Sequence, residues 1–333
     1  MNVLVTGAAG YVGSVCAEVL ISQGHRVIAL DNLIEGHRAA VPAACDFQKC
    51  DLFDTTRLDE IFRASEIHAV MHFAAEALVE KSVREPSTFY LANIAGGIHL
   101  LDAMMRHGVK KIVFSSSAAV YGEPKQVPIP EDHPKAPINS YGQTKWRFEE
   151  ILADYARYTG LKHVSFRYFN AAGASPERGE AHRTETHVIP KILEAASGEI
   201  PKFEIRGSDY ATPDGTCVRD YVHVLDIADA HVRALAEIDR VSGEAFNVGN
   251  SRGYSIREVV ETARRVTGLP IPAVEASRRA GDPAVLVADA AKLRRTLRWE
   301  PRYSTLESIL TTAWKWKQGH PNGYADMHSG ASH

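Results

Sequence analysis

The first 170 residues alternate short apolar segments with longer stretches of helical periodicity. The apolar segments predict strands at Val3–Thr6, Arg26–Leu30, Ala69–Phe73, Lys111–Ser115 and Val164–Tyr168. The stretches between them predict helices at Val12–Gln23, Thr55–Ala64, Ser87–His107 and Tyr141–Thr159. Near-continuous apolar strands separated by amphipathic helices are typical of a parallel sheet covered on both faces. The expected fold class is therefore α/β, with a doubly wound, Rossmann-type parallel sheet.

The alternation stops after about Ala171. Gly and Pro interrupt residues 173–215, and later helices are expected near Asp226–Arg240, Ser255–Thr267 and Thr305–Gln318. We expect residues 1–170 to form the dinucleotide-binding domain and residues 171–320 to form mainly a smaller α/β lobe that binds substrate. Some later segments should return to the main sheet. The polar end of the chain, residues 321–333, is expected to be a disordered tail.

Composition excludes several classes of function. The chain of 333 residues is 45% hydrophobic and 24% charged, with a net charge of −3, which favours neither nucleic acid nor a membrane surface as partner. With no apolar run long enough to span a bilayer and no signal sequence, we expect a cytoplasmic location. The four cysteines (Cys16, Cys45, Cys50 and Cys217) lack metal-ligand spacing. Reduced thiols and no metal are expected, although Cys45 and Cys50 leave a disulfide formally open.

A glycine-rich loop lies directly between the first strand and the first helix. Gly7, Gly10 and Gly13 surround Tyr11 and Val12 in the run TGAAGYVG. Glycines at this point let the backbone turn sharply and approach a pyrophosphate, which then rests on the positive end of the helix. The GxxGxxG spacing and its place after the first strand predict a nucleotide-binding loop.

The second strand ends in an acidic residue, Asp31. A carboxylate there can accept hydrogen bonds from both ribose hydroxyls and would repel the extra phosphate of NADP, so NAD is the favoured cofactor. Asp51 and Leu52, which follow another short strand, are candidates for the adenine edge. An ordinary turn aspartate is the alternative for Asp51.

Three polar side chains form the candidate catalytic group. Tyr141 and Lys145 are four residues apart at the start of a long helix, which places both on one face. An ammonium beside a phenol should lower the pKa of the phenol and make it a usable base. Ser117 follows the fourth core strand, at the edge where open parallel sheets bind ligands. Taken alone, Ser117 is also consistent with a helix cap, and the Tyr-Lys spacing also occurs on surface helices.

With these motifs in place, the chain resembles the extended short-chain dehydrogenase/reductase superfamily, and within it the UDP-glucose 4-epimerases. The resemblance runs nearly end to end. It is carried by VLVTGAAGYVGS, DNLIEGH, HFAAEALVEKSV, FSSSAAVYG, SYGQTK, FRYFNAAGA, DYATPDGTCVRDYVHVLDIADAH, FNVGNSRGYS, RRAGDPAVLVAD and HPNGY.

The resemblance implies a reaction. Tyr141 would take the proton of the sugar 4-hydroxyl while the C4 hydride passes to tightly bound NAD. The 4-keto sugar would then turn about its diphosphate linkage and be reduced on its other face, interconverting UDP-glucose and UDP-galactose. Lys145 would hold the cofactor ribose and tune Tyr141, and Ser117 would hydrogen-bond the C4 oxygen.

The resemblance also assigns binding residues. The cofactor would contact Asn32, Leu33, Phe73, Ala74, Ala75, Asn93 and Phe169, in addition to the glycine loop, Asp31, Asp51, Leu52 and the three catalytic residues. The UDP-sugar would contact Ser117, Tyr141, Asn170, His187, Val188, Arg206, Arg219, Arg279, Asp282 and Leu286. Arg219 and Arg279 would clamp the diphosphate, for which a planar guanidinium is suited. A homodimer through helices near Ser87–His107 and Tyr141–Thr159 is implied as well.

Three positions depart from the family pattern. Ala77 replaces a lysine that some members hold near the pyrophosphate, and Arg206 replaces an aromatic that often stacks on uracil. Leu286 stands where a bulky tyrosine would exclude an N-acetyl group and a small residue would admit it. UDP-N-acetylhexosamines therefore remain alternative substrates. A nucleotide-sugar dehydratase is a weaker alternative, because Ala118 and Ala119 occupy positions where such enzymes usually carry acids. A non-catalytic NAD-binding protein is the third.

Overall fold

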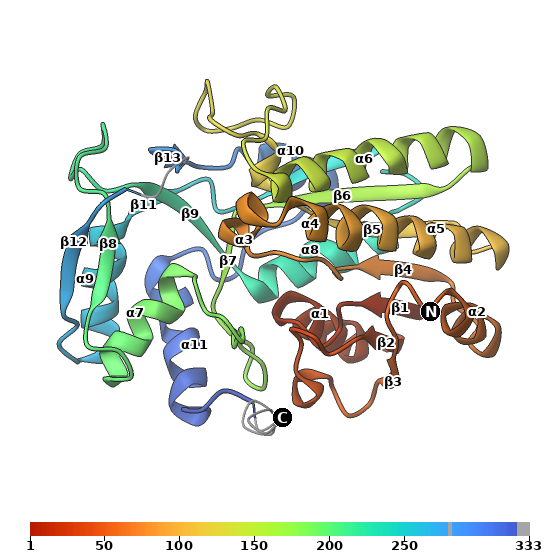
Figure 1. Cartoon of the computed structure of the whole chain (residues 1–333), viewed down its shortest axis with the longest axis horizontal. Coiled ribbons are helices and arrows are strands. Elements are labelled where there is room, and N and C mark those ends of the chain that lie inside the picture. Colours follow the sequence, from red (N-terminus) through yellow and green to blue (C-terminus); the bar gives the residue numbers. More distant parts are fainter. Residues whose placement is uncertain (279–281, 325–333) are drawn as a thin grey trace.

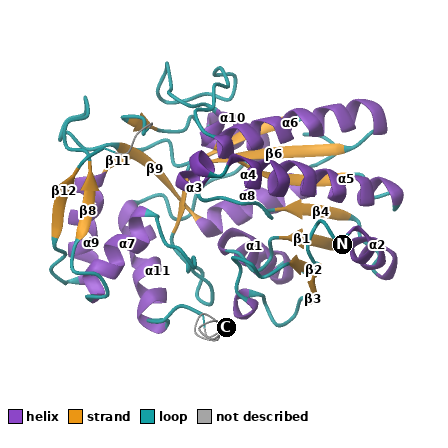
Figure 2. Ribbon diagram, viewed as in Figure 1, coloured by secondary structure: helices purple, strands orange, loops and turns teal. Residues whose placement is uncertain are grey.

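The central layer of the protein is a seven-stranded parallel sheet (Figures 1 and 2). The computed structural model describes residues 1–278 and 282–324. The strand order is β10-β6-β5-β4-β1-β2-β3, and every neighbouring pair is parallel. The strands are β1 (Asn2–Thr6), β2 (Arg26–Asp31), β3 (Asp46–Lys49), β4 (Ala69–His72), β5 (Lys111–Ser117), β6 (Lys162–Tyr168) and β10 (Glu244–Val248). The α/β class and the five predicted strands are confirmed.

Helices cover both faces of this sheet. Along β1 the buried side chains alternate, with Val3 and Val5 in one apolar cluster and Leu4 in another, as the twofold repeat of a strand requires. The cluster around Val3 and Val5 includes residues of α1 (Tyr11–Ser22), α8 (Val224–Ala236) and α10 (Ala291–Leu297). The cluster around Leu4 includes residues of α2 (Thr55–Ala64), α5 (Gly96–Arg106) and α6 (Ser140–Thr159). Alternating apolar side chains thus attach a helical layer to each face.

The predicted helix Ser87–His107 is divided in the structure. It comprises α4 (Pro86–Tyr90), a π-helical turn (Leu91–Ala95) and α5, and α3 (Val79–Arg84) precedes them. The π turn carries the buried Asn93, and such turns often occur at functional sites. The helical periodicity of the sequence showed the helix but not the change of hydrogen-bond pattern inside it.

A second body lies beside the sheet, at the left of Figure 1. Its strands are β7 (Asn170–Ala172), β9 (Val218–His223), β11 (Gly253–Ser255) and β13 (Val285–Leu286), in the order β11-β9-β13 with β7 also paired to β9. A separate parallel pair joins β8 (Phe203–Arg206) to β12 (Ala273–Ala276). Helices α7 (Val188–Ser197), α9 (Ile256–Thr267) and α11 (Leu306–Gly319) share its apolar core. Because β10, α8 and α10 belong to the first body, the chain passes between the two bodies several times.

The helices predicted after residue 171 are all present as α8, α9 and α11. Ser255 caps α9 and forms a capping box with Glu258, which explains why the helix begins there. Helices α3, α7 and α10 were not predicted. Pro190 lies in the first turn of α7, where its missing N–H has no helical partner to lose, so the proline did not prevent a helix.

The expected disorder from residue 321 onward is wrong for the residues that the structure describes. Tyr324 is only 6% exposed and packs with Ala40, Ala174 and Trp316. Its hydroxyl donates a hydrogen bond to the carbonyl oxygen of Gly179 at 3.2 Å. The buried ring of Tyr324 therefore keeps the chain packed as far as this residue. Residues 325–333, the rest of the predicted tail, lie outside the described residues.

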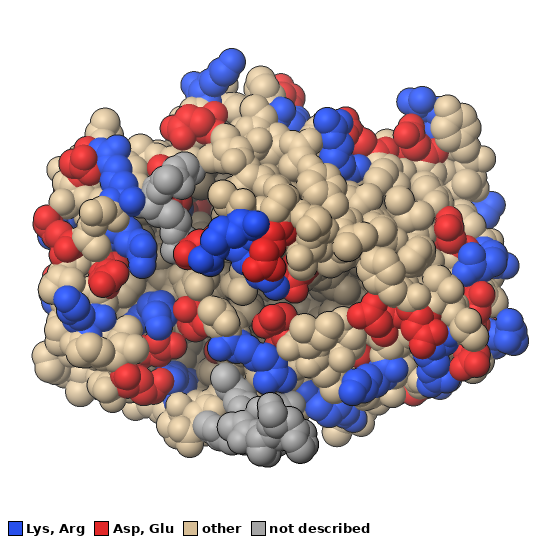
Figure 3. Space-filling model, in the orientation of Figure 1, with Lys and Arg blue, Asp and Glu red and all other residues tan. Residues whose placement is uncertain are grey.

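Charge and hydropathy of the folded chain agree with its composition. On the face shown in Figure 3, basic and acidic side chains are interspersed. Within residues 1–278 and 282–324, no helix has the length and apolar character needed to cross a membrane. Cys45 and Cys50 are separate thiols, so the disulfide left open by their spacing does not form.

The packing of α6 on α5 gives a stability prediction. Phe148 is fully buried, its ring centroid lies 4.8 Å from that of Phe114, and a Cβ at Gly97 would lie 2.3 Å from its ring. We expect Phe148→Ala to lower the free energy of unfolding by about 3–5 kcal/mol, because the cavity cannot be filled by neighbours. Urea denaturation followed by circular dichroism measures this. The control is Phe53→Ala, whose ring is 47% exposed, and a loss there as large as at Phe148 would contradict the packing argument.

Candidate active site

The glycine-rich loop packs tightly against neighbouring backbone atoms where α1 begins. A Cβ at Gly7, whose φ is +70°, would lie 2.5 Å from the backbone nitrogen of Ala74. A Cβ at Gly13 would lie 2.1 Å from the carbonyl oxygen of Gly7. Neither position accepts a side chain, so the free N–H groups of the first turn of α1 are open to close approach by an anion. The loop therefore leaves its backbone open to a ligand, and its role in binding a pyrophosphate stays a prediction.

The side chain of Tyr11 connects this loop to the second body. Its hydroxyl donates a hydrogen bond to the carbonyl oxygen of Gly173 at 2.6 Å. Val12 instead packs against the apolar clusters beneath the sheet. The loop is thus held from both sides, and its own contribution to a ligand comes from the backbone.

Asp31 lies at the end of β2, next to the glycine loop. One carboxylate oxygen accepts the N–H of Ala9 at 2.9 Å and the other accepts the N–H of Leu33 at 2.8 Å. Burial raises the pKa of this carboxyl, and the two N–H donors act against that rise. Because a carboxylate has about four acceptor positions, two remain for the hydroxyls of a ribose. This arrangement fits the predicted role.

The neighbouring residues of the predicted adenine edge also come together. The side-chain amide of Asn32 donates to Asp51 at 2.8 Å, and Asp51 accepts the N–H of Phe53 at 2.9 Å. Leu52 is buried beside them. Asp51 therefore orders a turn, the alternative role considered from sequence, and at the same time holds Asn32 at the ends of β2 and β3.

The segment after β4 lines the other side of the loop. Phe73 packs against the ring of His231, with centroids 4.9 Å apart, and Ala74 faces Gly7. Asn93, in the π turn, accepts the N–H of Glu76 at 2.8 Å and donates to Thr144 of α6 at 3.0 Å. Asn93 thereby joins the segment that contains Ala74 and Ala75 to the helix that carries Tyr141.

The candidate catalytic residues meet where β5 ends and α6 begins. Asn139 caps α6 by accepting the N–H of Gly142 at 2.8 Å. A Cβ at Gly142 would lie 2.4 Å from the carbonyl oxygen of Ala119, so the glycine lets the helix start press against the turn that follows Ser117. The amine of Lys145 donates to the carbonyl oxygen of Ser115 at 2.8 Å and lies 5.8 Å from the centre of the Tyr141 ring.

Ser117 has two roles in this arrangement. Its hydroxyl oxygen accepts the N–H of Ala119 at 3.1 Å and caps the 3-10 turn Ala118–Val120, which is the structural role considered from sequence. A hydrogen bond between the side chains of Ser117 and Tyr141 also lowers the pKa of the phenol. The cap and the contact with Tyr141 are compatible, because a hydroxyl both donates and accepts.

The expected net fall in the pKa of Tyr141 does not occur in the protein alone. Burial raises the pKa of Tyr141, and the hydrogen bond from Ser117 only opposes that rise. Burial also lowers the pKa of Lys145 to about 7, although the nearby Glu149 acts to raise it. Lys145 points at a backbone carbonyl in this state. A positive charge close to Tyr141 would act against the effect of burial and stabilise the phenolate.

A buried polar network supports this site from behind, and sequence reasoning missed it. Glu149, one turn after Lys145, accepts the hydroxyl of Ser116 at 2.5 Å and two hydrogen bonds from Arg167 at 3.0 and 2.6 Å. Arg167 also donates to the hydroxyl of Tyr121 at 2.9 Å. The signal was available, since Glu149 repeats the spacing of four that separates Tyr141 from Lys145.

Three predicted substrate residues lie on or near two paired strands, Arg219 on β9, Leu286 on β13 and Asp282 just before β13. Arg219 of β9 donates to the carboxylate of Asp282 at 3.1 Å, and its side chain is only 8% exposed. Leu286 of β13 is in register with Arg219. Leu286 and Phe169 both pack on the cluster that contains Ala118, next to Ser117. The strand pairing thus connects a buried guanidinium to the edge of the catalytic group.

Other predicted substrate residues lie apart from that group. The amide of Asn170 donates to the backbone carbonyl of Asp220 at 2.8 Å, and Arg206 is a half-exposed residue paired with Glu204 at 3.5 Å. His187 caps α7 and Val188 begins it. Arg279, predicted to clamp the diphosphate, lies outside the described residues.

This chain is similar to known proteins in both sequence and structure. Residues 3–249 match the family model of the NAD dependent epimerase/dehydratase family. A curated UDP-glucose 4-epimerase of Lacticaseibacillus casei is 47% identical over 331 residues, which cover 98% of this chain and 99% of that protein. The crystal structure of UDP-glucose 4-epimerase from Bifidobacterium longum in complex with NAD+ and UDP has a TM-score of 0.93 at 35% identity, covering 97% of this chain and all of that one.

A second solved structure is also similar to this chain. The UDP-Glc/GlcNAc 4-epimerase from Campylobacter jejuni has a TM-score of 0.84 at 37% identity and covers 96% of this chain and 99% of that one.

The close approach at Gly13 predicts a specific defect. We expect Gly13→Ala to weaken dinucleotide binding at least 100-fold, because the added methyl group must displace the backbone of the loop. Isothermal titration with NAD, after any bound nucleotide has been removed, measures the change. Gly319→Ala is the control, since a Cβ there meets nothing within 4 Å. Unchanged affinity in Gly13→Ala would show that the loop does not hold the dinucleotide.

Proposed function

We propose a function for this chain from one premise, that it belongs to the NAD dependent epimerase/dehydratase family. It interconverts UDP-glucose and UDP-galactose by inverting C4 of the sugar, using tightly bound NAD. The observation that carries the proposal is the meeting of Tyr141, Ser117 and Lys145 beside a loop shaped for pyrophosphate. The full-length similarity to curated UDP-glucose 4-epimerases supports the substrate class.

The protein's part in the reaction is proton transfer and positioning. Bound NAD supplies the redox chemistry by accepting a hydride from C4 and returning it. Tyr141 takes the proton of the 4-hydroxyl and later gives it back, and the positive charge of bound NAD would lower the pKa of this buried phenol. Ser117 donates a hydrogen bond to the C4 oxygen. Lys145, whose amine donates to the carbonyl oxygen of Ser115, would hold the cofactor ribose.

The diphosphate must be held while the sugar turns over between the two hydride transfers. Arg219 suits this task, because its side chain is nearly buried and its fork already meets a carboxylate, Asp282. We propose that Arg219 and Arg279 clamp the diphosphate and that Asp282 binds the uridine ribose. A fixed diphosphate with a mobile sugar exposes each face of C4 in turn.

Elimination is disfavoured by the lining of the site. Dehydration across C5 and C6 requires a general acid and base beside the sugar. Ala118 and Ala119, which follow Ser117 in a 3-10 turn, cannot transfer protons. Oxidation and reduction at C4 is the chemistry that remains for Tyr141.

We propose that the two parts of the chain bind different ligands. Residues 1–170 bind mainly NAD, and residues 171–320 bind mainly the UDP-sugar. Tight NAD retention is consistent with the Tyr11–Gly173 hydrogen bond, which joins the cofactor loop to the second body.

A homodimer is part of the proposal. It would form through the helices near Ser87–His107 and Tyr141–Thr159. Apolar side chains exposed beside these helices support it, namely Val83, 68% exposed on α3, and Leu91, 57% exposed in the π turn. A cytoplasmic location is proposed as well, in keeping with the thiols of Cys16, Cys45 and Cys50.

The decisive experiment removes the phenolic hydroxyl. We expect Tyr141→Phe to lower kcat for UDP-galactose by about 10²–10⁴-fold, while NAD remains bound, because the base is lost and the aromatic ring is kept. A coupled assay for UDP-glucose and the NAD content of the purified protein measure the two effects. Tyr158→Phe, on the exposed end of the same helix, is the control. Full activity in Tyr141→Phe would remove this residue from the mechanism, and no epimer from the unaltered protein would refute the function.

Substrate range depends on the residue beside the catalytic turn. Leu286 packs against the cluster of Ala118, so a larger side chain there narrows the sugar site. We expect Leu286→Tyr to reduce kcat/KM for UDP-N-acetylgalactosamine at least 10-fold relative to UDP-galactose, since a steric clash is selective. Parallel assays with both sugars measure the ratio. An unchanged ratio would place the N-acetyl group elsewhere.

A further inference from the structure

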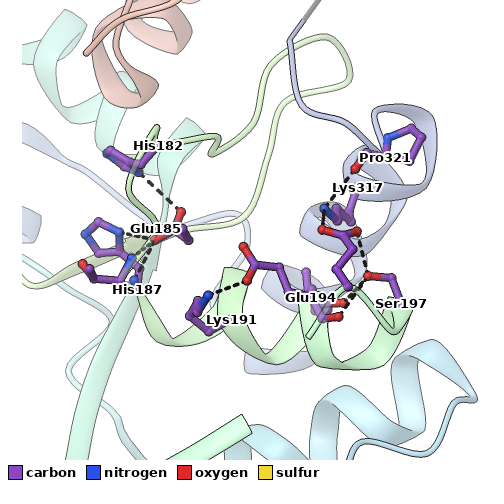
Figure 4. Close-up of polar contacts among 11 residues, drawn as sticks. His182, Glu185, His187, Lys191, Glu194, Ser197, Lys317 and Pro321 are labelled. Atoms are coloured by element: carbon purple, nitrogen blue, oxygen red, sulfur yellow. Dashed lines mark hydrogen bonds and ion pairs between the residues drawn. The ribbon is translucent and has the colours of Figure 1, made fainter. Parts of the chain in front are cut away.

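Four side chains with nitrogen and oxygen donors converge just before α7, and Figure 4 labels His182, Glu185 and His187 among them. They are Glu180, His182, Glu185 and His187, and one donor atom from each lies within 4.8 Å of all the others. The Nδ1 atom of His187 is 3.0 Å from Glu180 and 2.8 Å from Glu185. The Nδ1 atom of His182 is 3.4 Å from Glu180 and 3.5 Å from Glu185. Both glutamates therefore face both imidazoles.

Two atoms of this cluster are buried without a hydrogen bond. Among the described residues, Nδ1 of His182 and Oε2 of Glu185 have no hydrogen-bond partner and no exposed surface. The side chain of Glu185 is only 10% exposed, and its Oε2 atom forms an ion pair with Nδ1 of His182 at 3.5 Å. Buried polar atoms of this kind are rare and require an explanation, of which a bound ion is one.

We propose that Glu180, His182, Glu185 and His187 bind one zinc-class divalent cation. On a tetrahedron with metal–ligand bonds of about 2.1 Å, neighbouring ligand atoms are ~3.4 Å apart. With Oε2 as the ligand atom of Glu185, three nitrogen–oxygen distances, 3.0 to 3.5 Å, are close to that edge length. Two carboxylates would neutralise the charge of the ion, and imidazole with carboxylate is a donor set that zinc accepts.

The surroundings hold the ligands in place. The backbone N–H groups of Thr186 and His187 both donate to Oε1 of Glu185 at 2.7 Å, which orients the carboxylate and leaves Oε2 for the ion. Hydrogen-bonded ligands of this type are typical of metal sites. The carbonyl oxygen of Ala181 also contacts Nε2 of His37 at 2.7 Å, which fixes this segment against the first body.

A cavity gives the ion a path to the site. It has a volume of about 460 Å³, and Glu180, His182 and Glu185 contribute to its wall together with residues of α7 and α11. None of Ser117, Tyr141 and Lys145 lines it. The proposed ion would therefore hold the segment before α7 together, beside a cavity that the three catalytic residues do not line.

The alternative occupant of the cluster is a pair of protons. Burial lowers the pKa of His182, but Glu180 and Glu185 outweigh it and raise the pKa to about 9. Two protonated imidazoles between two glutamates would form a network of ion pairs without a metal. Metal binding and protonation use the same nitrogen atoms, so binding measurements distinguish the two cases.

The test is metal titration of the untagged, full-length protein after treatment with a chelator. We expect one Zn²⁺ per chain with a Kd in the micromolar range or below, and a Tm raised by roughly 2–5 °C at about 100 times that Kd. Co²⁺ in place of Zn²⁺ should give the intense visible absorption of a tetrahedral site. Absence of stoichiometric binding, or cobalt absorption without tetrahedral character, would overturn the proposal.

Variants locate the ion. His182→Asn with Glu185→Gln should weaken Zn²⁺ binding at least 100-fold, and His182→Asn alone should weaken it at least 10-fold. The matched control is Asp59→Asn with His107→Asn, which removes a His–carboxylate pair of 3.1 Å elsewhere and should not change the affinity. Far-UV circular dichroism confirms folding of each variant. Equal affinity in the unaltered protein and the His182 variants would overturn the assignment, and the readout does not depend on epimerase activity.

Discussion

The site depends on the geometry of a parallel sheet, in which all carboxyl ends meet at one edge. The glycine loop follows β1, Asp31 ends β2, Ala74 follows β4 and Ser117 ends β5. Each group reaches the same edge because its strand is held in register by its neighbours. Helix α6 completes the arrangement, since Gly142 allows its first turn to touch the chain after Ser117. The chemistry is therefore a property of the whole sheet and not of a single loop.

Behind this edge of the sheet, charged and polar side chains are buried. Because their burial is unfavourable unless they stay bonded to one another, it favours a single ordered arrangement. The carboxylate of Glu149 meets Ser116 and Arg167 with almost no contact with water. Losing one partner would leave an isolated charge in the interior, which is strongly unfavourable. A fully bonded network of this kind holds β5, β6 and α6 in one relation. It provides the rigidity that a catalytic group beside Ser117 needs.

The sequence predicted best where one local pattern decides the outcome. Apolar strands, the glycine loop and the capped helices α6 and α9 all followed from short-range rules. The expected return of later segments to the main sheet is confirmed by β10, which pairs with β6. Prediction failed where other contacts distant in sequence decide, as for the burial of Tyr324 and the network around Glu149. The pKa of Tyr141 belongs to this second class, because desolvation by the folded chain raises it more than the hydrogen bond from Ser117 lowers it. The cluster before α7 was also missed, since its four side chains meet only through the fold of an irregular segment that no helix or strand periodicity predicts.

The repeated passage of the chain between its two bodies has a consequence for how the protein can be divided. Strand β10 covers the outer edge of β6, and it comes from far beyond residue 170. A fragment that ends after β6 would present that strand with its backbone N–H and C=O groups unpaired, which invites pairing between molecules. The part of the chain that carries the glycine loop is thus a functional region without being an autonomous folding unit. Truncation of the chain after β6 should therefore yield aggregates and not a smaller soluble enzyme.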